Sequence, residues 1–387
     1  MSDVAPILRR PVETAPGNNY PLLAVRSFGR GTFCKPPLEG DEITWQNLFQ
    51  VRAGDLLFSN IKAWEGAVAI VANDDDGRYC SHRYITCAAD QAQVLPAFLG
   101  YYFRTPQAVW QLAQASPGSA DRNRTLSMAA LKRILVPLPS LEEQGRIVAQ
   151  LNTVVAKLHQ IDAIHGEIDR TIAALEKKAL VDEIARYRGR PHRRLSEVVV
   201  VTGGGTPSRH NPTYWDGDIP WVTPKDMKQD VISDSQEHIS AEGIQNSPAK
   251  LVNASSVLIV VRGMILARTV PVALITRSVA INQDMKALTP LPGLRSDYLW
   301  TWLLCCGEEL LSRVGKSTHD TRKLESAALL SLPIYIPEEG QQQEFVARVC
   351  RIRAQIGEFK RTKIVALTEQ SHVLPAMLLE IFGEGEA

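Results

Sequence analysis

Few residues of this chain have the types and spacing that catalysis or metal binding requires. Cys80, His82 and Cys87 lie close together, but no fourth ligand follows at a zinc-like spacing. Residues 74–77 (Asp-Asp-Asp-Gly) lack the spaced carboxylates and final glutamate of a calcium loop, so they predict a turn. Residues 203–206 (Gly-Gly-Gly-Thr) resemble a phosphate cradle but lack the Lys-Ser/Thr ending of a P-loop. We therefore expect no metal and no cofactor in this chain.

Residues 211–214 carry the motif closest to a known catalytic sequence. The run Asn-Pro-Thr-Tyr is similar to the Asn-Pro-Pro-Tyr motif of adenine methyltransferases, which holds a flipped base by stacking and amide hydrogen bonds. Thr213 breaks the motif, and no glycine-rich cofactor loop of the accompanying kind is present. We therefore predict that the chain is not itself an adenine methyltransferase.

Polar, basic segments are the stronger candidates for a functional surface, because guanidinium, ammonium and hydroxyl groups suit phosphate oxygens. Residues 119–124 and 317–323 match each other, and Lys316 precedes the second segment. These segments either contact phosphates or serve as structural loops that cap the following strand. Trp64 and Trp221 are expected to pack in the core. The full set of candidate contact residues is Arg26, Arg30, Lys35, Lys62, Arg78, His82, Arg83, Arg122, Arg124, Ser208, Arg209, Thr223, Lys225, Arg262, Lys316, Ser317, His319, Arg322 and Lys323.

The overall composition limits the classes of protein that fit. The chain has 387 residues, 45% of them hydrophobic, and a formal net charge of +1. Two or three globular domains are expected, whereas a strongly basic DNA-coating protein and an acidic disordered chain are excluded. No apolar run approaches the roughly 20 residues that cross a bilayer, and the N-terminus lacks the apolar core of a signal peptide. The 6 cysteines form no Cys-x-x-Cys pair. We expect reduced thiols in a soluble, cytoplasmic protein without membrane contact.

The chain contains an internal repeat with an offset of 198 residues. Arg124 matches Arg322, Gln144 matches Gln342, and the Ala-Ala-Leu run at 129–131 recurs at 327–329. Such a long period indicates a duplicated domain with an appendage rather than a solenoid.

Each copy begins with a strand-rich globular part. Short apolar runs bounded by turn residues predict strands, which then lead into helical segments and a closing apolar strand with prolines. In the first copy the strands are expected at 55–59 and 66–71, the helical segment at 95–115 and the closing strand at 134–139. In the second copy the corresponding ranges are 256–261, 270–275, 297–314 and 332–337.

Each copy ends in a long helix. Ser140 is predicted as the first N-cap, with Glu143 completing a capping box, and Gly189 and Pro191 end that helix. Apolar residues then recur at alternating steps of three and four, which predicts a coiled-coil seam. The seam positions are Leu151, Val154, Leu158, Ile161, His165, Ile168, Ile172, Leu175 and Ala179 in the first helix, and Val349, Ile352, Ile356, Phe359, Lys363, Ala366, Gln370, Val373 and Met377 in the second.

The two helices are expected to pair with each other in antiparallel orientation, although such a stripe also fits ordinary core packing. One polar residue interrupts each seam, His165 and Lys363, and we interpret both as register-setting or solvated positions. Arginines cluster after the first helix, where they either bind phosphate or form a linker with cations at a helix C-terminus. These are Arg186, Arg188, Arg190, Arg193 and Arg194.

Several segments are similar to the motifs of one protein family. Residues 205–208 and 214–222 look like the opening of a target-recognition domain, and residues 136–144 look like the junction into a conserved helix. Residues 334–337 followed by Gln342 resemble a second such junction. The chain thereby resembles the specificity subunits of type I restriction-modification systems over essentially its whole length. The first copy lacks the first opening and resembles another recognition-domain subtype through residues 51–57, 63–66 and 81–84.

The resemblance implies an α+β fold with two duplicated, mixed α/β target-recognition domains separated by two long antiparallel coiled-coil helices. The boundaries expected are 1–139 and 189–337 for the recognition domains, and 140–188 and 338–387 for the spacer helices. A helix of that length is roughly 70 Å long, or about two turns of DNA, so it is expected to set the gap between two half-sites.

The function implied is that of a non-catalytic DNA sequence-specificity subunit in a phage-defence restriction system. It would read an asymmetric bipartite target, one half per domain, and direct adenine-N6 methylation, cleavage or both by partner subunits. The partners implied are double-stranded DNA, two methyltransferase subunits and, in some complexes, restriction or translocase subunits. S-adenosylmethionine, ATP and Mg²⁺ are expected on those partners. The alternative function is a coiled-coil scaffold whose duplicated domains bind protein without reading DNA sequence.

Overall fold

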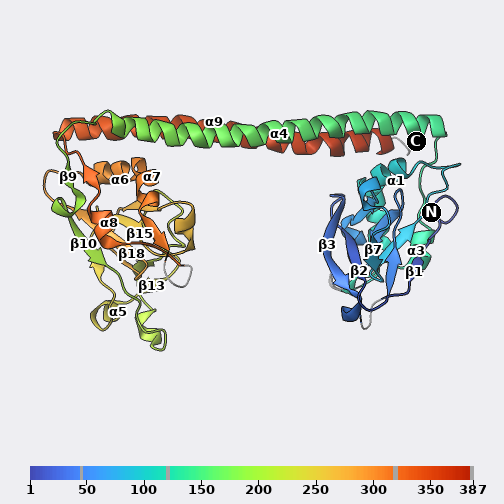
Figure 1. Cartoon of the computed structure of the whole chain (residues 1–387), viewed down its shortest axis with the longest axis horizontal. Coiled ribbons are helices and arrows are strands. Elements are labelled where there is room, and N and C mark those ends of the chain that lie inside the picture. Colours follow the sequence, from blue (N-terminus) through green and yellow to red (C-terminus); the bar gives the residue numbers. More distant parts are fainter. Residues whose placement is uncertain (44–46, 119–122, 317–320, 384–387) are drawn as a thin grey trace. The chain divides into compact units, whose positions relative to one another are not determined.

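The chain forms two compact units, and each unit contains part of both long helices (Figure 1). The computed structural model describes residues 1–43, 47–118, 123–316 and 321–383. One unit comprises Met1–His165 with Lys363–Ala387, and the other comprises Gly166–Thr362. Each unit therefore combines one strand-rich globular domain with a stretch of each long helix.

Two sheets are present among the described residues of the first globular domain. In the smaller sheet, β5 (Leu56–Ser59) lies between β6 (Val68–Ile70) and β8 (Tyr84–Cys87) and is antiparallel to both. The strands predicted at 55–59 and 66–71 are therefore confirmed. The larger sheet has the order β1-β4-β7-β2-β3, in which β2 and β7 are parallel. Its strands are β1 (Arg10–Val12), β2 (Asn19–Val25), β3 (Thr32–Glu39), β4 (Leu48–Gln50) and β7 (Tyr79–Ser81).

The second globular domain places β15 (Val257–Val260) where the first places β5. It is antiparallel to β16 (Val272–Ile275) and β18 (Met285–Pro290), which confirms the strands predicted there. All four side chains of β15 are buried, as expected for a continuous apolar run. The sheet order is β10-β18-β15-β16-β12, with β10 (Val199–Gly203) and β12 (Val231–Ile232) at its edges.

Smaller sheets complete the second domain. One has the order β13-β11-β17-β14, and two others are strand pairs, β19 with β20 and β21 with β9. A short helix, α5 (Ala241–Gln245), lies between β13 and β14 in the chain. The strands are β9 (Arg193–Arg194), β11 (Ile219–Val222), β13 (His238–Ile239), β14 (Leu251–Val252), β17 (Val279–Ile281), β19 (Val314–Lys316), β20 (Arg322–Leu324) and β21 (Pro333–Ile334).

Short helices follow the strands of each domain at equivalent places, and the helical segments predicted at 95–115 and 297–314 are confirmed by α1, α2, α6 and α7, whereas α3 and α8 were not predicted. Aromatic side chains on α1 and α6 fill the two cores: Phe98 and Tyr102 in the first domain, Tyr298 and Trp302 in the second. The helices are α1 (Pro96–Tyr102), α2 (Pro106–Gln114) and α3 (Met128–Lys132) in the first domain, and α6 (Ser296–Cys305), α7 (Gly307–Ser312) and α8 (Ser326–Leu330) in the second.

The closing strand predicted at 134–139 is wrong. Pro137 and Pro139 have no amide proton to donate to a ladder, so this segment joins no sheet. Side chains satisfy its backbone instead: Gln111 accepts the N–H of Leu135, and Tyr102 donates its hydroxyl proton to the Leu135 carbonyl at 3.0 Å. Of the closing strand predicted at 332–337 in the second domain, only the short strand β21 forms, and it is antiparallel to β9.

The long helices α4 (Leu141–Ala185) and α9 (Glu339–Gly383) are each 45 residues in length. Ser140 is the N-cap of α4, as predicted, because its Oγ accepts the N–H of Glu143 at 3.2 Å. The predicted capping box is only half formed: the Glu143 carboxylate pairs with Arg146 at 2.6 Å. Among the described residues, no helix combines the length and apolarity needed to span a bilayer.

The two long helices run antiparallel in both units, as predicted. The predicted seam is wrong at several positions, because two paired helices bury only a narrow stripe of each other: Ile161, Ile168, Leu175, Phe359 and Val373 are exposed. In the first unit, Leu151 packs with Leu378, and Gln370 donates from its amide to Asp162 at 2.8 Å. In the second unit, salt bridges join α9 to α4 at Lys360–Glu176, 2.7 Å, and Arg348–Glu183, 3.1 Å.

One buried glutamine fastens each long helix to its globular domain. Gln342, 1% exposed, accepts the N–H of Arg295 at 3.0 Å and donates to the carbonyls of Gly293 at 2.8 Å and Pro337 at 2.9 Å. Gln144, which is fully buried, repeats this pattern with Leu95, Gln93 and Pro139. The sequence repeat therefore preserves a three-bond anchor as well as a fold.

Candidate nucleic-acid interface

A tryptophan between two cations marks the surface of the first globular domain. Trp64 lies on the 3-10 turn η2 (Ala63–Glu65), which joins β5 to β6. Lys62 Nζ and the Arg124 guanidinium carbon each lie 5.0 Å from its ring centroid. Trp64 is half-buried, so its predicted core position is wrong, and Ala63 is the buried residue of the turn. The aromatic face attracts both cations and thereby gathers two predicted contact residues.

The remaining predicted cations of the first domain are dispersed. Arg26 lies over the Phe33 ring at 4.8 Å, and Arg30 is exposed, 5.7 Å from the Phe28 ring. Arg78 pairs with Asp75 at 2.9 Å, which occupies its guanidinium. Lys35 and Arg83 line a common hollow of about 240 Å³, and His82 precedes Arg83.

In the second domain, Arg209 is held by two partners. Its terminal nitrogens donate to both carboxylate oxygens of Glu237, and its guanidinium carbon lies 3.5 Å from the Trp215 ring centroid. The hydrogen bond from Arg209 keeps the pKa of Glu237 below its usual range. Trp221 packs edge-on against Trp215 and is 4% exposed, so its predicted core position is confirmed. Arg209 and Glu237 line a cleft in the second domain.

That cleft has a volume of about 650 Å³ and collects donors and acceptors from several loops. Thr223 bonds to Asp226 through its hydroxyl at 2.8 Å, and Lys225 is exposed beside it. Asn282 and Asp284 also line the cleft, from the turn between β17 and β18. Ser208, also predicted, is exposed next to Arg209 and caps the N–H of His210. Hydrogen-bonding groups of both kinds are what reading base edges requires.

A basic turn lies beside this cleft. Arg262 precedes the 3-10 turn η7 (Met264–Ala267), and its guanidinium lies 4.0 Å from the carboxylate of Asp284. The carbonyl of Arg322 accepts the N–H of Gly263 at 3.1 Å, and Lys323 pairs with Glu325 at 2.8 Å. The predicted residues Arg122, Ser317 and His319, and the side chain of Lys316, lie outside the described residues.

The motifs that resemble catalytic or metal sites have structural roles. The Asn211 side chain accepts the N–H of Thr213 at 3.2 Å and so caps a turn. A Cβ on Gly204 would lie 2.2 Å from the carbonyl oxygens of Ile281 and Asn282, so this glycine permits close packing of two backbones. Asp76 accepts the N–H of Ala53 at 2.8 Å. Among the described residues, no group of three or more His, Cys, Asp or Glu side chains is arranged to hold a metal ion.

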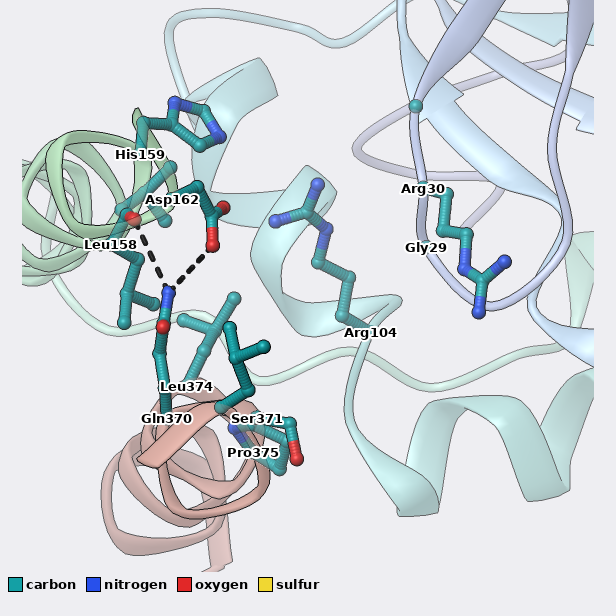
Figure 2. Close-up of a pocket in the computed structure, with 13 residues that line it drawn as sticks. Gly29, Arg30, Arg104, Leu158, His159, Asp162, Gln370, Ser371, Leu374 and Pro375 are labelled. Carbon is teal, nitrogen blue, oxygen red and sulfur yellow. Dashed lines mark hydrogen bonds between the residues drawn. The ribbon is translucent and has the colours of Figure 1, made fainter. Parts of the chain in front are cut away.

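Sequence reasoning missed a hollow in the first unit, shown in Figure 2, with a volume of about 690 Å³. Arg104 and Arg30 line it on the side of the globular domain, and α4 and α9 form the other walls. Gln370 donates to Asp162 there, and burial lowers the pKa of Arg104. The apolar wall residues are Val155, Leu158, Leu367, Leu374 and Pro375.

Comparison with known proteins settles the family. The model of the type I restriction modification DNA specificity domain matches the chain twice, at residues 7–169 and 191–368. The chain belongs to this family. The two matches coincide with the two copies of the sequence repeat, and each covers one globular domain and the start of the helix that follows it.

Two curated proteins are similar to this chain over part of its length. Over 230 residues it is 30% identical to the type I restriction enzyme EcoR124I/EcoR124II specificity subunit of Escherichia coli, covering 58% of this chain and 56% of the relative. Over 195 residues it is 27% identical to the MjaIX specificity subunit of Methanocaldococcus jannaschii, covering 49% and 42%. The chain thus spans about half the length of the curated relatives it matches.

Solved structures share the fold over nearly the whole length. The HsdS subunit from Thermoanaerobacter tengcongensis matches with a TM-score of 0.57 and 21% identity, covering 100% of this chain and 96% of that one. A chain from a study of complex assembly and conformational transition in the type I R-M system matches with a TM-score of 0.72 and 21% identity, covering 98% and 97%. The predicted α+β fold, with duplicated domains and long helices, is therefore confirmed.

Proposed function

We propose that this chain is the DNA sequence-specificity subunit of a type I restriction-modification complex. The observation that carries the proposal is the double family match, at residues 7–169 and 191–368, with one copy per globular domain. The two domains differ in their surface residues, so each would read a different half of an asymmetric target. The chain itself would be non-catalytic and would direct adenine-N6 methylation, cleavage or both by its partners.

The distribution of cations supports contact with double-stranded DNA. Lys62 and Arg124 flank one turn of the first domain, and Arg262 lies beside a cleft of mixed donors and acceptors in the second. Cations of this kind position a protein on phosphates, whereas exposed groups in the cleft such as Gln236 and Lys225 have the chemistry to read base edges. A net charge of +1 does not oppose this function, because the cations are gathered at local sites.

Exposed apolar residues on the long helices support protein partners, since large exposed apolar surfaces mark interaction sites. These residues recur at the offset of the repeat: Ile161 with Phe359, Leu175 with Val373, and Val181 with Leu379. Because equivalent positions recur, the helices would bind two copies of one subunit. We assign these exposed apolar positions on the long helices to the binding of two methyltransferase subunits, which would bring S-adenosylmethionine. Restriction subunits, where present, would bring ATP and Mg²⁺.

Methylome sequencing of the host with and without this gene tests the proposal. The expected result is the loss of one bipartite, asymmetric N6-methyladenine motif when the gene is deleted. Replacing residues 196–332 with the matching segment of a relative should change one half of that motif and leave the other intact. An unchanged methylome in a host with active modification subunits would contradict the proposal and favour the protein-binding scaffold.

A further inference from the structure

The turns η2 and η7 occupy equivalent places in the two globular domains. Each connects the strands of an antiparallel hairpin, β5 to β6 and β15 to β16. In each domain, the chain just before the turn accepts a backbone hydrogen bond from the segment that follows the polar loop of the same copy. The N–H of Leu126 donates to the carbonyl of Asn60 at 2.8 Å, and the N–H of Leu324 donates to the carbonyl of Val261 at 2.9 Å. The duplication has therefore placed the same kind of turn on both domains.

The second domain exposes two adjacent large apolar side chains on its turn. Met264 is 67% exposed and Ile265 is 41% exposed. Arg262 and Arg268 lie on either side of them in the chain, and both are exposed. Gly263, at φ +136, begins the turn with a backbone conformation that side chains rarely adopt. The turn thus presents two apolar side chains with an exposed arginine before and after them in the chain.

The first domain repeats this combination with different residues. Ile61 is 41% exposed, and Trp64 is half-buried between Lys62 and Arg124. Here too a left-handed glycine, Gly66 at φ +74, ends the turn. Both turns therefore carry exposed apolar side chains accompanied by cations.

We propose that both turns are wedges that insert an apolar side chain against or between neighbouring base pairs of the target duplex. This inference rests on the proposed DNA-reading function. Wedge residues such as Met and Ile partly unstack a base step, and the exposed side chains of this kind are Met264 and Ile265 in the second domain and Ile61 in the first. The flanking cations then bind the phosphates on either side of the step.

Charge favours DNA as the occupant of these turns over a protein surface. Lys62 and Arg124 lie over the Trp64 ring, and Arg262 and Arg268 are exposed on either side of Met264 and Ile265 in the chain. Glu65 pairs with Lys62, and Asp284 pairs with Arg262. Two domains that differ elsewhere share this arrangement, and the target duplex is the ligand that both would contact. Unstacking at a site read by each domain would also add specificity through the deformability of the step.

Fluorescence of 2-aminopurine tests the wedge in the second domain. The full chain in complex with its modification subunits is added to target duplexes that carry 2-aminopurine at single positions other than the methylated adenine. We expect a rise in fluorescence at one step of the half-site that the second domain reads. The double variant Met264→Ala/Ile265→Ala should lose this rise and bind about ten-fold more weakly. Met264→Leu, which keeps the apolar volume, should retain both.

A matched control lies at the other end of the same sheet. Val260, just before the turn, pairs with Met285 at the start of β18. Leu291 follows the other end of β18, away from the turn, and is 39% exposed. Leu291→Ala should bind with unchanged affinity and an unchanged fluorescence rise. Circular dichroism of all variants confirms folding, and the exposure of Met264 means that its loss should not lower the midpoint of thermal unfolding.

Three results would overturn the wedge. One is the absence of any responsive 2-aminopurine position although the complex binds its target tightly. Another is a double variant with the same rise and affinity as the wild type. The last is a double variant that loses its modification subunits in size-exclusion chromatography, which would make the turn a protein-binding site. Failure of the proposed function gives a different pattern: the wild-type complex would then show no preference for the target duplex, and that result overturns both proposals.

Discussion

The anchor formed by Gln342 offers the sharpest test of how the globular domains are held to the long helices. We predict that Gln342→Leu destabilises the second unit strongly while filling nearly the same volume. The substitution removes three hydrogen bonds, to the N–H of Arg295 and to the carbonyls of Gly293 and Pro337. Leucine cannot replace any of them.

The size of the effect follows from the burial of the groups left behind. The bond to Pro337 is fully buried, so that carbonyl loses its hydrogen-bond partner without access to water, at a cost of about 1–3 kcal/mol. The other two bonds are partly buried and contribute about 1 kcal/mol each. Leucine recovers about 1 kcal/mol through apolar burial. We therefore expect the free energy of unfolding to fall by about 3 kcal/mol.

Urea unfolding measured by hydrogen–deuterium exchange reports this loss unit by unit, which matters because two compact units need not unfold in one transition. Protection should fall at the start of α6 and of α9, around Arg295 and Gln342. Gln343→Leu is the matched control: it makes the same chemical change at the next residue, which is exposed, and should alter stability by less than about 0.5 kcal/mol. Gln144→Leu should reproduce the loss in the first unit.

The reasoning would be refuted if Gln342→Leu were no more destabilising than Gln343→Leu. It would also be refuted if protection fell in the first unit and remained unchanged in the second, because the three lost bonds all lie within Gly166–Thr362.

Further predictions concern thiols, an ion pair and the helix seam. Ellman's reagent at pH 8 should react quickly with the exposed Cys34 and Cys350 and slowly with the other four of the 6 cysteines. Burial raises the pKa of Cys80, Cys87 and Cys305 to about 12 and that of Cys306 well above its usual value, so these four thiols remain protonated. Four fast thiols would contradict this prediction. Arg209→Ala should lower stability at pH 7 by less than about 1 kcal/mol, since the pair with Glu237 is half exposed. Because Arg209 lowers the pKa of Glu237, the stabilisation from this ion pair is present above the unfolded-state pKa of Glu237 and is lost as pH falls through the folded-state pKa. The urea midpoints of variant and wild type should therefore converge in acid. A gap that stays constant with pH would show that stacking of Arg209 on Trp215 accounts for the loss. His165→Leu should raise the thermal midpoint of the isolated chain by an amount equivalent to about 1 kcal/mol. The substitution removes from the helix seam a buried ring nitrogen, Nδ1 of His165, that has no hydrogen-bond partner. A lower midpoint would instead show that His165 stabilises the helix pair.

Short-range patterns in the sequence predicted most of the secondary structure. The periodicity of three and four residues located α4 and α9, and the repeat located the equivalent strands and helices of the two domains. Ser140 was recognisable as an N-cap because capping depends on residues three positions apart. Where two prolines interrupted an apolar run, at 134–139, the predicted strand failed because a strand also needs backbone donors.

Candidate contact residues were predictable by type and only partly by position. The sequence marked Lys62, Arg124 and Arg262 as cations in loops, and the repeat paired Arg124 with Arg322. Nothing in the local sequence indicated that Arg209 would meet Glu237, which is 28 residues away, or that Trp64 would lie between two cations at the surface. The hollow around Arg104 likewise arises from four segments that are distant in the chain.

The sequence by itself determined the duplication, the two long helices, the apolar strands and the family, because these depend on periodicity, local capping and motif order. Only the tertiary structure decided which side chains are free to act. It buried Trp221 but left Trp64 at the surface, packed Gly204 against β17 where its sequence resembled a phosphate cradle, and turned Met264 and Ile265 toward solvent. The physical reason is that the exposure and pairing of a side chain are set by residues far along the chain, and these are brought together only when sheets and helices pack.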